Sequence, residues 1–444
     1  MSERVFIREL NKHVGKNVLL KGFVHAIRRQ GSISFVVLRD ITGTTQTVTL
    51  KSNKEAFDFI KTLTPESSVE IKGVVKAFEK APNGIEVNVS EATMISPSAT
   101  DLPIPVYEKG TNETSTVIRH QQRFLDLRKP KNALIMKLSS EFDRYYREFL
   151  LQQGFFEIHT PKLMPTPSES TSNLFEVKYF NKKAYLAQSP QLYKQMAIAS
   201  GMEKVFEVAP IFRAEKSFTT RHATECTSYD VEMAYIKDHE DVMRLEENMI
   251  VFILSKIKES YGDEIKELYG IDLKVPEIPF PRITMQDAKK LLGSKDTESD
   301  LSSDEEKALG DYFSSKGQDF VFLTDFPIKA RPFYHKHYND KPCTKSADLI
   351  YKGLEITTLA QREERPDVLT KQLKDKGLGT KDIQWYLDFF KYGVPPHGGF
   401  GLGGARFIKQ LLNLESIREA MFIYRGVNYL YPQSLEKIVE KTRD

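Results

Sequence analysis

The sequence predicts an α+β fold in two parts, and three observations support this prediction. Short segments rich in β-branched and aromatic residues fill residues 17–98. A basic, proline-containing stretch follows, and after it apolar residues recur at helical spacing. Beyond that helix, segments of alternating apolar and polar residues follow one another at hairpin-like spacing, which favours an antiparallel sheet over parallel βαβ units.

The first part, residues 1–100, is expected to form a five-stranded barrel. Residues 55–62 have helical spacing and separate the third strand from the fourth. Five strands with a helix after the third are typical of an OB barrel, although another small β-barrel or a β-sandwich fits the pattern equally well. The strands are expected at 17–27, 32–40, 44–50, 67–79 and 84–95, with turns at Thr42-Gly43 and Asn83-Gly84.

Residues 101–130 are expected to be a hinge, because prolines interrupt regular structure there and residues 119–130 (RHQQRFLDLRKP) are basic. The second part, residues 131–444, begins with an amphipathic helix that ends at Gly154. A polar stretch at about 262–319 indicates a small insertion. Within it, Ser303 and Glu306 have the spacing of a capping box.

Composition limits the classes of function. The 444 residues carry 64 Lys+Arg and 61 Asp+Glu, a net charge of +3, which excludes binding to nucleic acid by bulk charge but allows a local basic patch. No run approaches the ~18 apolar residues that span a bilayer, and the N-terminus is charged where a signal peptide is apolar. The two cysteines form no zinc or disulfide pattern. We therefore expect a cytoplasmic protein that does not contact a membrane.

Two segments suit a polyphosphate. Residues 212–222 (FRAEKSFTTRH) place two arginines and a histidine around one loop, and guanidinium groups bind phosphate oxygens in pairs. Residues 399–407 (GFGLGGARF) combine glycines, which allow close approach to the backbone, with Arg406 at the start of a helix. Taken singly, the first segment also fits a solvated hairpin and the second a structural turn. The glycine segment is neither a P-loop nor a dinucleotide fingerprint.

Two further segments suit a metal ion and an amino acid. In SADLIYKGLEITT, Asp348 and Glu355 stand seven residues apart on what is expected to be one strand. A bulge at Lys352-Gly353 would turn both carboxylates into one cleft, where they would hold Mg²⁺. Residues 188–195 (QSPQLYKQ) gather amides and a lysine where a strand passes into a helix. The alternatives are two surface acids and an ordinary helix start.

Taken in this order, the segments resemble the three signature motifs of the class II aminoacyl-tRNA synthetases. GFFEIHTPKL (154–163), with Pro161, resembles motif 1; FRAE and TRH in 212–222 resemble motif 2; GLGGAR (401–406) resembles motif 3. QSPQLYKQ, GLEITTLAQRE and KYGVPPHGGFGLG are similar to the aspartyl/asparaginyl subgroup, and most similar to its archaeal-type aspartyl members. The resemblance covers essentially the whole chain.

The resemblance implies an anticodon-binding OB barrel, a hinge, and a catalytic domain on an antiparallel sheet flanked by helices. It also implies a homodimer formed through motif 1. The implied reaction joins L-aspartate to ATP as aspartyl-adenylate, with Mg²⁺, and then transfers the aspartyl group to the 3′ end of tRNA-Asp. An asparaginyl enzyme, an amino-acid-activating paralogue and a non-catalytic nucleic-acid-binding protein are the alternatives.

Site residues follow from the resemblance. Arg213 and Arg406 are the catalytic pair, and positioning with electrostatics carries the step because a carboxylate is already a nucleophile. The resemblance also assigns residues to each ligand. ATP would be bound by Arg213, Glu215, Arg221, His222, Glu355 and Arg406, and Mg²⁺ by Asp348 and Glu355. Aspartate would be bound by Glu169, Ser189, Gln191, Lys194, Asp230, Arg362 and His397, and the anticodon by His25, Arg28, Phe35, Gln46 and Pro82.

Two of these groups predict specificity. Lys194 and Arg362, both aimed at one side-chain carboxylate, would be left uncompensated by the neutral amide of asparagine. His25 and Pro82 resemble relatives that charge both tRNA-Asp and tRNA-Asn, so we expect relaxed tRNA choice. The chain departs from the family pattern at three places: Cys226 replaces an adenine-stacking aromatic, Ser170 and Thr171 replace glycines, and the segment after Arg425 lacks the usual acidic and second basic residues.

Overall fold

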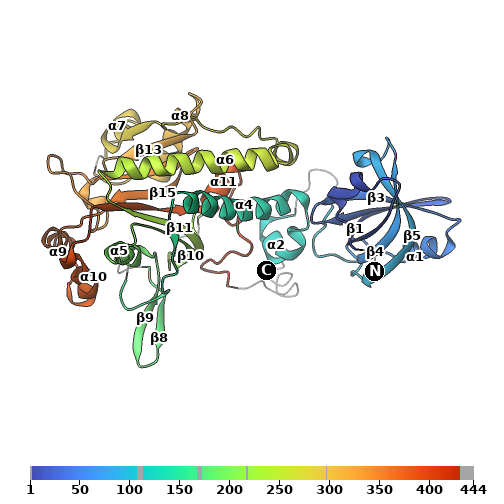
Figure 1. Ribbon diagram of the computed structural model, residues 1–444, viewed down its shortest axis with the longest axis horizontal. Coiled ribbons are helices and arrows are strands. Elements are labelled where there is room, and N and C mark those ends of the chain that lie inside the picture. The colour runs from blue at the N-terminus through green and yellow to red at the C-terminus, as the bar shows by residue number, and fades with distance from the viewer. Residues whose placement is uncertain (1–2, 108–113, 168–172, 217–218, 297, 431–444) are drawn as a thin grey trace, which may run out of the picture. The chain divides into compact units, whose positions relative to one another are not determined.

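The structure is a computed structural model that describes residues 3–107, 114–167, 173–216, 219–296 and 298–430, without the side chains of Pro82 and Asp382 (Figure 1). Contacts divide the described chain into two compact units, one ending at Ala133 and the other beginning at Leu134. In these residues, no helix has both the length and the apolar character needed to cross a membrane.

The first unit contains a closed five-stranded barrel with the strand order β1-β2-β3-β5-β4. Only the β3–β5 pair is parallel. The helix α1 follows the third strand, so the predicted OB barrel is confirmed. Alternating apolar residues such as Val36 and Leu38 point inward and are fully buried. The elements are η1 (Ile7–His13), β1 (Asn17–Gln30), β2 (Ile33–Asp40), β3 (Gly43–Leu50), α1 (Lys54–Lys61), β4 (Ser68–Ala77), η2 (Pro82–Gly84) and β5 (Ile85–Ser96).

Part of the stretch that we predicted as a hinge is helical and belongs to the first unit. Two short helices form there, α2 (Thr116–Gln121) and α3 (Arg123–Asp126). After them, Arg128 donates to Glu66 of the barrel at 3.0 Å, and Arg39 donates to both oxygens of the same carboxylate. These charge-assisted bonds tie the end of the connector to the barrel.

The second unit is built on an eight-stranded sheet with the order β12-β13-β14-β15-β16-β11-β10-β6. The pairs from β13 to β10 are antiparallel, as predicted, and the two edge pairs, β12–β13 and β10–β6, are parallel. The strands are β6 (Phe156–Glu157), β10 (Lys204–Phe212), β11 (Glu225–Ala234), β12 (Arg282–Thr284), β13 (Phe320–Thr324), β14 (Ser346–Tyr351), β15 (Leu354–Gln361) and β16 (His397–Gly403).

Three helices cover one face of this sheet (Figure 1). They are α4 (Pro130–Gln152), α6 (His239–Tyr269) and α11 (Gly404–Leu411). Phe400 and Leu402 of β16 point into the core beneath them, and α4 ends before Gly154, which has a positive φ of 79°, as predicted. Since strand residues alternate, the intervening glycines of β16 face the opposite side.

The remaining elements surround that opposite side. A small three-stranded sheet, β7-β9-β8, stands beside α5, and α7 and α8 lie within the predicted insertion. The helix α6 runs through residue 262, where we expected the insertion to begin, and ends at Tyr269; the domain boundaries stay predictions. The elements are β7 (Leu163–Met164), β8 (Glu176–Tyr179), β9 (Lys182–Leu186), α5 (Gln191–Ala199), α7 (Met285–Leu291), α8 (Ser303–Ser314), η3 (Ile328–Ala330), α9 (Pro366–Asp375), η4 (Lys381–Ile383), α10 (Gln384–Phe389) and η5 (Phe390–Tyr392).

The predicted capping box is displaced by one residue. Ser302 caps α8, and Glu305 closes the box by accepting from the backbone N–H of Ser302. The expected pair, Ser303 and Glu306, is therefore available for other contacts, because one helical turn needs only one such cap.

Candidate active site

A cavity of about 370 Å³ opens on the sheet face away from α4 and α6. Its floor is formed by β11, β15 and β16, where Gly401 and Gly403 leave room that a side chain would fill. A cavity of this size is typical of small-molecule sites. Ten of the predicted residues line it: Ser189, Gln191, Arg213, Glu215, Arg221, His222, Asp230, Glu355, Arg362 and Arg406.

One end of the cavity gathers the cations of the 212–222 and 399–407 segments. Arg213 is exposed toward the cavity. Arg406, in the first turn of α11, donates to the backbone oxygen of Glu355 at 2.9 Å and lies 3.4 Å from its carboxylate. The Nε2 atom of His222 lies 3.8 Å from Glu215. This end therefore presents positive charge from two chain segments and is suited to phosphates.

The pKa of His222 is lowered by its surroundings. Burial lowers it, the Glu215 carboxylate opposes that shift, and Arg406, Arg221 and Arg213 lower it further. The imidazole is consequently neutral near pH 7, and its Nδ1 lies 2.6 Å from the hydroxyl of Thr219.

The acid pair is arranged differently from our prediction. Lys352 and Gly353 have positive φ values of 45° and 76° and form a hairpin turn, so Asp348 and Glu355 lie on two neighbouring strands, β14 and β15. The expected bulge at Lys352-Gly353 was therefore wrong. A register shift does occur in the same ladder, between Leu349 and Ile350. It places Glu355 opposite Ile350, two residues from Asp348 and so on the same face.

Asp348 has a partner that the sequence did not reveal. Arg331 donates to its Oδ2 at 2.5 Å, and the guanidinium carbon of Arg331 lies 3.4 Å from the centre of the Phe326 ring. Burial raises the pKa of Asp348 to about 7 against the effect of Arg331. Burial would also raise the pKa of Glu355, but Arg406 and Arg331 outweigh it and lower that pKa.

At the other end of the cavity, two cations and two acids form a closed cluster. Lys194 is 1% exposed, and its Nζ lies 2.9 Å from Asp230 and 3.5 Å from Glu232. Arg362 donates to both oxygens of Glu232, at 2.9 and 3.3 Å. Burial would raise the pKa of Glu232, but Arg362 and Lys194 outweigh it and lower the pKa.

The cluster corrects the charge argument from the sequence. Lys194 does not line the cavity, and Glu232 already compensates both cations that we expected to meet the substrate. A signal for Glu232 was present, because Ser228, Asp230 and Glu232 alternate along β11 and so point to one face.

Two predicted aspartate-binding residues, His397 and Glu169, are not among the described residues that line the cavity. His397 is fully buried outside the cavity lining, with Gln195 at 2.9 Å from its Nε2 and the Pro395 carbonyl at 2.8 Å from its Nδ1. Burial lowers its pKa. Glu169, with Ser170 and Thr171, lies outside the described residues. At this end the cavity is lined instead by His335, whose Nε2 is 3.2 Å from Arg362.

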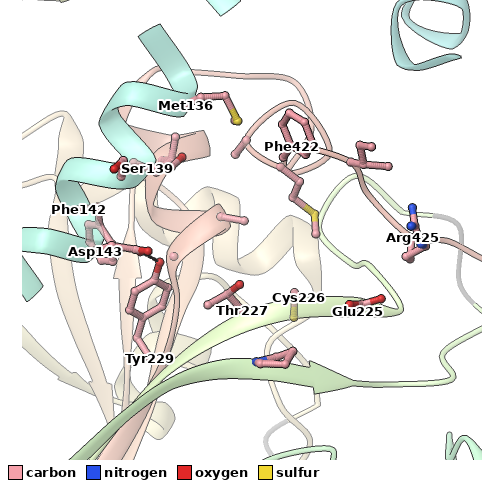
Figure 2. A pocket seen from close by; sticks show the side chains of 18 residues that line it. Met136, Ser139, Phe142, Asp143, Glu225, Cys226, Thr227, Tyr229, Phe422 and Arg425 are labelled. Carbon is pink, nitrogen blue, oxygen red and sulfur yellow. Dashed lines mark hydrogen bonds between the residues drawn. The ribbon is translucent and has the colours of Figure 1, made fainter. Parts of the chain in front are cut away.

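A second cavity of about 510 Å³ lies on the other side of β11 (Figure 2). Cys226, Thr227 and Ala405 line both cavities. Tyr229 donates a hydrogen bond to Asp143 of α4 (Figure 2), and a Cβ added to Gly404 would lie 2.3 Å from the Tyr229 ring. Cys226, where an aromatic was expected, thus lies in the wall that the two cavities share.

Comparisons with known proteins agree with this arrangement. Residues 115–424 match the family model described as tRNA synthetases class II (D, K and N), and residues 18–95 match the model of an OB-fold nucleic acid binding domain. The chain belongs to the class II aminoacyl-tRNA synthetases of this group. It is accordingly an aminoacyl-tRNA ligase.

Relatives within the family carry two names. Aspartate–tRNA(Asp) ligase from Pyrococcus horikoshii is 42% identical over 96% of this chain and 97% of its own length. Aspartate–tRNA(Asp/Asn) ligase from Methanopyrus kandleri is also 42% identical, over 94% of this chain and 96% of its own. Among solved structures, asparaginyl-tRNA synthetase from Pyrococcus horikoshii with asparaginyl-adenylate has a TM-score of 0.91 at 37% identity, covering 97% of this chain and all of that one.

In this synthetase the predicted anticodon residues lie on the barrel. Arg28 is exposed and pairs directly with the half-buried Phe35, and Gln46 pairs with the next residue but one on β2, Val37, so the three share the outer face. Gln46 donates to Glu86 at 3.2 Å.

His25 lies where the register of β1 shifts, 2.8 Å from Arg39. Burial and then Arg39 lower its pKa. Pro82 lies in η2, between β4 and β5, and its side chain is outside the described part.

Proposed function

We propose that this synthetase is an aspartate–tRNA ligase. The observation that carries the proposal is the placement of Arg362 and Arg213 in one cavity: a guanidinium suited to a side-chain carboxylate at one end, and phosphate-binding cations at the other. The aspartate-specific names of relatives at 42% identity support it.

The proposed reaction has two steps. The α-carboxylate of aspartate attacks the α-phosphate of ATP, a new O–P bond forms, and pyrophosphate leaves. A terminal ribose hydroxyl of tRNA then attacks the acyl carbon and AMP leaves. Arg213 would stabilise the charge on the α-phosphate, while Arg406 and His222 would hold the outer phosphates. The side chains need only orient the reactants, because the attacking group is already ionised.

Asp348 and Glu355 are proposed to hold Mg²⁺. Carboxylate oxygens are the donors that this ion prefers, and Oδ1 of Asp348 is buried with no hydrogen-bond partner among the described residues, so the donor set fits the ion. When bound, the ion would neutralise phosphate charge.

The proposed partners are tRNA-Asp, tRNA-Asn and a second copy of the chain. Arg28, Phe35 and Gln46 would contact the anticodon through stacking and base-edge hydrogen bonds. His25 and Pro82 support relaxed choice between the two tRNAs. The homodimer is proposed on the motif 1 resemblance.

An asparaginyl enzyme is the second candidate, because Asp230 and Glu232 balance Lys194 and Arg362 without any substrate charge. ATP–pyrophosphate exchange with aspartate and with asparagine separates the two. We expect exchange with aspartate alone, and aspartylation of both tRNA transcripts. Exchange driven by asparagine would refute the proposal, and charging of tRNA-Asp alone would refute the relaxed tRNA choice.

A further inference from the structure

The insertion helix α8 is fixed rigidly to the hairpin that carries Asp348 and Glu355. A Cβ added to Gly310 of α8 would lie 2.0 Å from the backbone nitrogen of Gly353, so the two backbones are in direct contact at the turn. From the other side, Gln410 of α11 donates to the Tyr351 and Lys352 carbonyls at 2.9 and 2.7 Å. The helix and the turn therefore form one rigid element.

The first turn of α8 presents two oxygen-bearing side chains toward the cavity wall. Arg221 donates one terminal nitrogen to the hydroxyl of Ser303 at 2.6 Å and the other to the carboxylate of Glu306. The same carboxylate accepts the backbone N–H of Glu355 at 3.3 Å. The Arg221 and Glu306 side chains are only 15% and 12% exposed. One acid of the insertion thus joins a predicted ATP-binding arginine to a predicted metal-binding strand.

We propose that Glu306 is a positioning residue for ATP, which orients Arg221 toward the outer phosphates and holds the Glu355 backbone in register with it. This inference rests on the proposed function only in that ATP is the ligand. Ser303 assists, because two acceptors on one helical turn hold a planar guanidinium in a single orientation.

The opposite arrangement, in which Glu306 competes with ATP for Arg221, is less consistent with the contacts. If Arg221 moved away, the Glu306 and Glu355 carboxylates would face one another without it. Two negative charges so near one another are unfavourable in a partly buried setting. The arginine therefore stays on α8 and binds phosphate with its orientation already determined, which lowers the entropic cost of binding.

The test compares four variants of the full-length protein by calorimetric titration with ATP and by ATP–pyrophosphate exchange. Glu306→Gln keeps the size of the side chain and removes its charge; Arg221→Ala and the double variant complete a cycle. Asp304→Asn is the matched control, since Asp304 is an exposed acid on the same turn. We expect Glu306→Gln to weaken ATP binding and raise KM for ATP about tenfold, with kcat and KM for aspartate within about twofold of wild type.

The double variant should be no weaker than Arg221→Ala, and Asp304→Asn should match wild type. Tighter ATP binding by Glu306→Gln, unchanged binding, additive losses in the double variant, or an equal change in all kinetic constants would each overturn the inference. A wild type that binds ATP but does not respond to aspartate would refute the proposed function alone, because the ATP titration still decides the role of Glu306.

Discussion

The two ends of the catalytic cavity both use arginine, but they hold it differently. At the amino-acid end, Arg362 is buried and bound by both oxygens of Glu232, which also pairs with Lys194. At the phosphate end, Arg213 is exposed to the cavity, and Arg221 is bound by α8 at one face.

The difference follows from what each end has to bind. Removing either partner of a buried ion pair leaves the other charge uncompensated and destabilises the fold. The intact pair holds a single geometry around a small ligand. A polyphosphate carries several charges, so a cation exposed to the cavity, such as Arg213, and one held in a fixed orientation, such as Arg221, can both meet it. Substitutions should therefore affect stability at one end and activity at the other.

The largest effect is expected from Glu232→Ala. It leaves two buried cations without their shared partner, so the free energy of unfolding should fall by about 3–5 kcal/mol. Urea denaturation measures this loss. Glu215→Ala, which removes an acid from the phosphate end, should change stability by less than about 1 kcal/mol, because its contact with His222 is long and partly exposed. Equal losses of unfolding free energy in the two variants would contradict the proposed difference between the two ends of the cavity.

Arg213→Ala should have the opposite effect, a large loss of activity with little change in stability. Loss of one preorganised donor to the transition state lowers kcat by about 100- to 1,000-fold, while unfolding free energy changes by less than about 0.5 kcal/mol. Pyrophosphate exchange and urea denaturation measure the two quantities. Lys216→Ala, an exposed cation of the same loop, is the control and should retain wild-type exchange. A large stability loss in Arg213→Ala would show that the phosphate end is also structural.

Gly404→Ala tests a contact between the two elements that carry Asp230 and Arg406. Its Cβ would lie 2.3 Å from the ring of Tyr229, between the strand of Asp230 and the helix of Arg406, so overpacking should cost about 1–3 kcal/mol. Gly262→Ala, in the interior of α6, is the control and should stabilise by roughly 0.5–1 kcal/mol. Thermal denaturation compares them. If Tyr229→Leu did not relieve the loss in the Gly404→Ala background, the clash would not be its cause.

The smallest effect concerns pH. Because burial and the surrounding arginines lower the pKa of His222, the residue gains its positive charge only on acidification, and the charged form binds phosphate better. KM for ATP should therefore fall severalfold as the pH drops below 6.5, the ordinary pKa of histidine, whereas KM for aspartate should change less, since the pKa of Glu232 is lowered and the cluster stays ionised. His222→Gln should remove the pH dependence of KM for ATP. If the pH dependence persisted in that variant, a titratable group other than His222 would be its cause.

Local patterns predicted most of the framework. The barrel strands and α1 fall within a few residues of their expected positions, because alternating apolar residues and the turn glycines are local signals. The capping box was displaced by one residue, since Ser302-Ser303 and Glu305-Glu306 offer two equivalent spacings. In the box that formed, Glu305 also lies 3.2 Å from the buried Lys289.

The sequence by itself determined the family, the order of the motifs and ten of the residues that line the cavity, because these depend on residue identity and spacing. Only the tertiary structure decided how their charges are paired. Glu232 lies beside Lys194 and Arg362, Arg331 beside Asp348, and Glu306 beside Arg221, and each pair joins segments at least 17 residues apart. Such pairing depends on strand register and helix docking, which no local pattern in the chain encodes.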